Sequence, residues 1–215
     1  MVNDHGSVEA TRSVVSQLQM RQLFAKLDSI QELQSYQIDR DRDRDIVPPF
    51  LNARDNIIRV QNSDSIEGQR EYISKAVSEL TSAINAVYTD MGTATNHLQK
   101  LTRWHIFQRF DQIKKYIEFL TRDIQLSTKF VGVQTHLLDY IGESKSTVLE
   151  LERYRHIVHG FFSKPLGSRK ISAAMLIHQY YPYTEENLNS WVTLSKEIGA
   201  QLQPRLDSSE NKKYS

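Results

Sequence analysis

The densest group of side chains that could take part in chemistry lies in residues 150–160, which contain Arg153, Arg155, His156 and His159. On a helix, His156 and His159 are one turn apart, so their imidazoles could approach one metal ion. Two ligands are too few for a zinc site, and we predict no metal and no other cofactor. The simplest interpretation of the segment is a basic last helical turn that complements the helix dipole.

Five residues separate Arg153 from His159, in a helix that we expect to follow a helical bundle. This arrangement resembles the Arg-x(4–6)-His motif of the HEPN-type ribonucleases, and the match covers this helix only. The resemblance implies a dimeric, metal-independent ribonuclease in which His159 takes part in proton transfer and Arg153 contacts phosphate. A motif of this kind is a hypothesis that its structural context must support.

Helix geometry favours the non-catalytic interpretation of the same residues. At 100° per residue, Arg153 and His159 lie about 120° apart around the helix axis, whereas Arg155 and His159 share one face. The helix alone therefore does not bring the catalytic pair together. We favour a structural role, with Gly160 as the C-terminal cap.

A basic patch surrounds this helix. Residues 144–178 carry six Lys or Arg side chains and only Glu150 and Glu152 as acids. Phe161, Phe162, Tyr180 and Tyr181 flank the patch, and such mixtures bind single-stranded nucleic acid by stacking and charge. The predicted nucleic-acid contacts are Arg153, Arg155, Lys164, Arg169 and Lys170.

Other features narrow the function classes. The chain has no Walker loop, GxGxxG, GxSxG or HExxH motif, and its zero cysteines exclude disulfides and Cys-ligated metals. A net charge of +1 provides no global attraction to nucleic acid or membranes. No secretion signal or apolar run of about 20 residues is seen, so we expect a cytoplasmic protein without membrane contact.

The elements that position these residues are predicted from spacing. Only 8 Gly and 5 Pro occur in 215 residues, which disfavours a turn-rich β fold. Two ladders of apolar residues alternate in steps of three and four, as in long packed helices over residues 66–101 and 103–141. The predicted apolar seam for self-association or a partner helix is Ile73, Val77, Leu80, Ile84, Val87, Ile113, Ile117, Leu120 and Ile124.

The two ladders are out of phase between Leu101 and Ile106, so the chain must turn or kink. If the helices are short, we favour a turn at Gly92–Asn96, where helix propensity is weak, over one at Thr102–His105. Ser127–Gly132 is a second weak point. Gly142 is predicted to end the second helix.

The predicted fold is an all-α, elongated helical bundle of antiparallel, coiled-coil-like helices with a small helical C-terminal part. Residues 1–47 form an amphipathic helix and an Asp/Arg-rich strip at 39–45, which is either a hinge before Pro48 or a docking strip. Residues 48–142 hold the long helices. Residues 143–203 are helical, with a capping box at Thr147 and further helices around 171–180 and 184–198, and residues 204–215 form a polar tail.

These patterns together favour a non-enzymatic interaction or assembly subunit of a larger intracellular complex of bacterial type. It would bind a protein partner through the apolar seam and nucleic acid through the basic patch. The alternative is an HEPN-like, metal-independent ribonuclease that uses Arg153 and His159.

Overall fold

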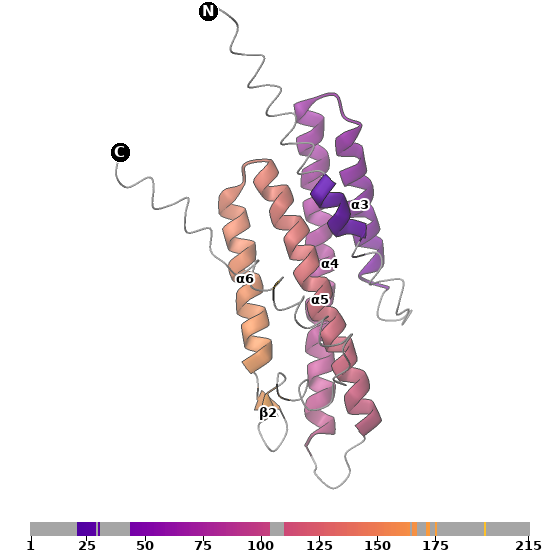
Figure 1. The fold of residues 1–215 in the computed structure, drawn as a ribbon, viewed down its shortest axis with the longest axis vertical. Coiled ribbons are helices and arrows are strands. Elements are labelled where there is room, and N and C mark those ends of the chain that lie inside the picture. The colour runs from indigo at the N-terminus through magenta and orange to yellow at the C-terminus, as the bar shows by residue number, and fades with distance from the viewer. Residues whose placement is uncertain are drawn as a thin grey trace, which may run out of the picture.

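The computed structural model of the chain describes residues 21–28, 30, 44–103, 110–163, 165–166 and 171–172, together with residues 175 and 196. Within these residues the fold is an elongated antiparallel bundle of long helices with one short β ladder (Figure 1). The all-α class predicted from the sequence is confirmed. The labelled helices are α3 (Val47–Gln61), α4 (Ile66–Leu101), α5 (Phe110–Tyr140) and α6 (Ser144–Ser163).

Helix α3 begins at the two prolines that the sequence suggested would end the preceding segment. Pro48 and Pro49 occupy its first positions, where a missing amide hydrogen and a fixed φ are compatible with a helix. The helix packs against α4 and buries Phe50 and Ile57 among other residues. Before it, residues 21–28 are helical with Leu23 and Leu27 buried, which confirms the N-terminal amphipathic helix over that stretch.

Helix α4 runs through Gly92 without a break, so the favoured turn at Gly92–Asn96 is wrong. The helix ends after Leu101, within the alternative region. Glycine inside a helix costs only about 1 kcal/mol relative to alanine. Continuing the helix buries Met91, Ala94 and Leu98, and each large apolar side chain gains about 1.5–3 kcal/mol on burial. Burial therefore outweighs the weak local propensity.

Helix α5 lies at the centre of the bundle. It contacts α4 and α6, and its Phe130 ring packs against Phe50 of α3 with 5.6 Å between ring centroids. From Leu120 to Leu138 almost every side chain is buried. The weak point predicted at Ser127–Gly132 is therefore wrong, because packing on all sides holds the helix together.

The turn between α5 and α6 is a Schellman motif at Gly142, which confirms the predicted stop. Gly142 has φ +81°, and the Glu143 amide donates to the Leu138 carbonyl over 2.8 Å. Helix α6 then begins at Ser144, so the capping box expected at Thr147 is wrong. Thr147 is buried, and its hydroxyl donates to the Asp139 carboxylate over 3.0 Å, tying α6 to the end of α5.

After α6 the chain forms a short antiparallel ladder. Strand β1 (Pro165–Leu166) pairs with β2 (Ile171–Ser172), and β1 contacts α4. The helix expected around 171–180 is thus wrong at its first two residues, where the pairing of the two strands takes the place of helical bonds. The rest of that helix, the helix at 184–198, the tail and most of the 39–45 strip lie outside the described residues.

The predicted apolar seam is the core between the helices of this chain. Eight of its nine side chains are buried, and Val77 is partly buried against the same cluster. The same cluster includes Tyr154, Val158 and Phe161 of α6. The apolar edges of α4 and α5 are therefore covered by the chain's own helices.

Candidate functional site

Which face of α6 is turned toward the core decides which of the candidate site residues are exposed. Tyr154 is fully buried, and its phenol shares a 2.6 Å hydrogen bond with the Thr128 hydroxyl of α5. Val158 and Phe161 follow on the same buried face. Because Tyr154 points into the core, Arg153 and Arg155 on either side of it lie at the surface.

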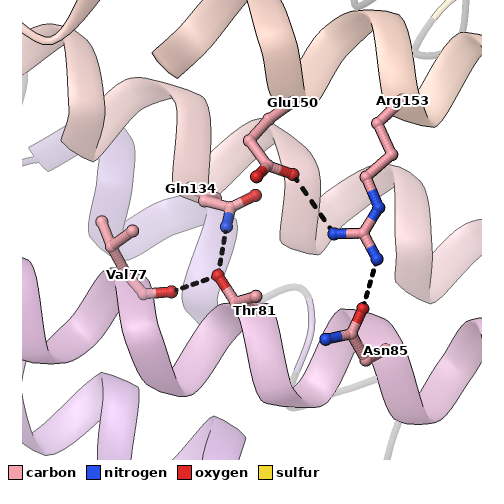
Figure 2. Close-up of polar contacts among 6 residues, drawn as sticks. All are labelled: Val77, Thr81, Asn85, Gln134, Glu150 and Arg153. Atoms are coloured by element: carbon pink, nitrogen blue, oxygen red, sulfur yellow. Dashed lines mark hydrogen bonds and ion pairs between the residues drawn. The ribbon is translucent and has the colours of Figure 1, made fainter.

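Arg153 joins α6 to α4. Its guanidinium donates a hydrogen bond to the Asn85 side-chain oxygen, lies 3.8 Å from the Glu150 carboxylate and stands 5.7 Å from the centroid of the Tyr88 ring. Figure 2 shows the side chain reaching from α6 down to Asn85. These contacts use the planar guanidinium as a connector between helices.

His159 is exposed further along α6, and His156 is exposed beside it. Arg153 contacts Asn85 and Tyr88 of α4 and Glu150 of its own helix. With about 120° between their positions on the helix, Arg153 and His159 point in different directions. A joint catalytic role of the two residues stays a prediction.

This packing shifts the pKa of Tyr88. Burial raises the pKa of its phenol, the neighbouring Tyr154 raises it further, the Arg153 guanidinium lowers it, and Glu150 raises it. Desolvation is the largest of these causes because the charged phenolate would lose its hydration. The phenol is neutral at physiological pH.

The basic patch is described only in part. Arg155 is exposed on α6, and Arg153 is held by the contacts to α4. Lys164, Arg169 and Lys170 lie outside the described residues. Nucleic-acid contact through this patch stays a prediction.

The sequence did not lead us to expect another polar contact, which joins α4 and α5. Gln134 of α5 is only 1% exposed, and its amide donates to the Thr81 hydroxyl of α4 over 2.7 Å. The Thr81 hydroxyl donates in turn to the Val77 carbonyl, as Figure 2 shows. Steps of three, four and three residues lead from Ile124 to Gln134, so Gln134 lies on the continuation of the apolar ladder of α5. A polar residue at such a position was the sequence signal for a buried polar contact.

Metal-binding clusters and membrane-spanning helices are both absent from the part of the chain that the structure describes. Among the described residues, no group of three or more His, Asp or Glu side chains is placed to hold a metal ion. No helix within the same residues combines the length and apolar character needed to cross a bilayer.

No protein-family model, curated protein sequence or solved structure matches the chain.

Proposed function

We propose that the chain is a non-enzymatic helical interaction subunit of a larger cytoplasmic complex. The observation that carries the proposal is a pair of adjacent, exposed apolar side chains on α6. Val148 is 55% exposed and Leu149 is 64% exposed. Exposed apolar groups on a rigid helix favour burial against a partner protein, since each gains free energy when it leaves water.

The contacts of Arg153 support the non-enzymatic part of the proposal. A ribonuclease of the resembled kind needs its arginine to face phosphate, but this guanidinium is engaged by Asn85 and Glu150. Breaking those contacts would cost free energy before any substrate could be bound. The HEPN-like alternative is therefore the weaker of the two functions.

The fold also changes which surface is proposed to bind. The apolar seam of α4 and α5 is buried inside the bundle, so it has little surface to offer a partner. The outer face of α6 at Val148 and Leu149 is the proposed contact instead. An intracellular, bacterial-type complex stays part of the proposal, and the absence of cysteine is compatible with it.

An affinity capture from the source cells tests the proposal, with the Val148→Ser/Leu149→Ser variant beside the wild type. Leu51→Ser/Ile58→Ser is the matched control, because these two side chains of α3 are also exposed, at 43% and 36%. We expect one protein to be captured by wild type and control but lost with the α6 variant. Equal capture by all three proteins would contradict the assignment of α6, and light scattering of the purified pair would confirm a true complex.

A further inference from the structure

The end of the bundle where α4 turns into α5 is more basic than the opposite end. Lys100 and Arg103 at the end of α4, and Lys114 and Lys115 at the start of α5, are all exposed. Residues 97–103 contain no acid, and residues 110–119 contain only Asp111 and Glu118. We name the surface formed by these two stretches the basic end.

The opposite end has the reverse balance. Residues 62–71, where α3 turns into α4, contain Asp64, Glu67 and Glu71 against Arg70 alone. The α5–α6 turn at residues 139–145 adds two acids and one lysine. Charge is thus polarised along the bundle, so an anionic polymer is attracted to one end and repelled from the other.

The basic end also carries a stack of rings. His97 of α4 lies on Tyr116 of α5 with 4.8 Å between ring centroids and 6° between planes. Phe119 meets Tyr116 edge to face at 5.9 Å, and the Lys115 ammonium lies 5.2 Å from the Phe119 ring centroid. His97 is exposed, and Tyr116 and Phe119 are partly exposed. Flat rings and ammonium groups therefore share one surface.

We propose that the basic end binds single-stranded nucleic acid without sequence specificity. Such binding needs cations for successive phosphates and exposed rings on which bases stack, and both are present within the two stretches. An acidic protein would use the cations but would have no need of a stacked His–Tyr pair. This inference goes beyond the proposed function, because it adds a second class of partner through residues that the α6 contact does not use.

Fluorescence anisotropy of the full chain tests the inference, with a labelled oligouridylate of about 16 nucleotides as the probe. The charge variant is Lys100→Gln/Lys114→Gln/Lys115→Gln. The matched control is Arg70→Gln/Lys75→Gln/Lys145→Gln, which removes the same charge at exposed positions toward the opposite end. All six positions are exposed, so circular dichroism should show unchanged helicity.

We expect the charge variant to bind the oligonucleotide more weakly. The slope of the logarithm of the association constant against the logarithm of the salt concentration should become flatter by about 2, because each lost phosphate contact contributes about 0.7 for single strands. His97→Ala should weaken binding about tenfold with an unchanged slope, since stacking is not a charge effect. The control variant should bind like the wild type.

Five outcomes would overturn the inference, the fifth of them in a competition experiment. Four come from the binding measurements. They are no binding by the wild type at low salt, equal loss with the control variant, no effect of His97→Ala, and loss only when Arg155 and Lys164 are changed to Gln. The last outcome would assign nucleic acid to the patch around α6 instead. Displacement of the probe by polyglutamate at the same charge concentration would indicate an acidic protein partner. None of these results depends on whether α6 captures a protein.

Discussion

The Arg153 guanidinium donates a hydrogen bond to the Asn85 side-chain oxygen and thereby connects α6 directly to α4. Helix α6 packs mainly on α5, so this bond reaches past the central helix. Arg153 also meets Glu150 and the Tyr88 ring. The residue that most suggested catalysis from the sequence thus has a structural task, which can be separated experimentally from a catalytic one.

Arg153→Ala should lower the free energy of unfolding by about 1 kcal/mol, a modest value because the side chain is partly exposed. The matching fall in melting temperature is about 2–4 °C for a chain of this size. Arg155→Ala is the control on the same helix, and we expect it to change little. Circular dichroism melts measure both, and equal stability of the two variants would show that the Asn85 contact contributes nothing.

His159→Ala tests the ribonuclease alternative with a different readout. Wild type and variant are incubated with total RNA, with and without EDTA, and cleavage is followed on gels. For the proposed interaction subunit we expect no cleavage by either protein. Metal-independent cleavage that is lost in the variant would instead establish catalysis, since a general acid or base contributes about 10²–10⁴-fold to rate.

Leu80→Asp and Ile117→Asp should each abolish the native fold, because both side chains are fully buried between α4 and α5. The loss of apolar contacts and the burial of a charge together cost about 5 kcal/mol or more, comparable with the stability of a whole domain. Ser78→Asp is the control, since Ser78 is exposed on α4. Native melting of the two buried variants would mean that this packing is wrong.

Stability should fall with rising pH above the ordinary tyrosine pKa because of Tyr88. Its pKa in the folded state is raised above the ordinary value of about 10, so above that pH the unfolded chain ionises while the folded phenol stays neutral. The unfolding free energy then decreases by about 1.4 kcal/mol per pH unit from this residue. Urea unfolding of wild type and Tyr88→Phe measures the effect. The difference in unfolding free energy between the two proteins should be constant from neutral pH to about pH 9 and should shift in favour of the variant above pH 10. A difference that stays constant over the whole pH range would refute the prediction.

Gly92→Ala should stabilise the protein by about 0.5–1 kcal/mol. Gly92 lies inside α4, and an added Cβ would meet no atom within 4 Å. Gly142→Ala has equal space but should destabilise by about 1 kcal/mol, because φ is +81° there. Chemical denaturation compares the two, and a loss of stability with Gly92→Ala would mean that α4 is broken at this glycine.

Local sequence patterns are sufficient to predict the helical class, the apolar core and one helix end. Leu80, Ile84, Ile117 and Ile124 were assigned to packed helices from spacing alone, because a period of three and four residues puts them on one face. Gly142 was identified as a stop because only glycine enters the left-handed region without strain. These properties depend on neighbours in the sequence.

Packing between residues far apart in the sequence sets where α4 ends, what covers the core and which side chains Arg153 contacts. Gly92 stays helical because its neighbours in the same helix, Met91, Ala94 and Leu98, are buried against the rest of the bundle, and that gain is not visible in local propensity. Asn85 and Arg153 are 68 positions apart, and Thr81 and Gln134 are 53 apart. Such pairs form because the bundle sets the rotation and offset of its helices, which depend on the packing of all of them at once.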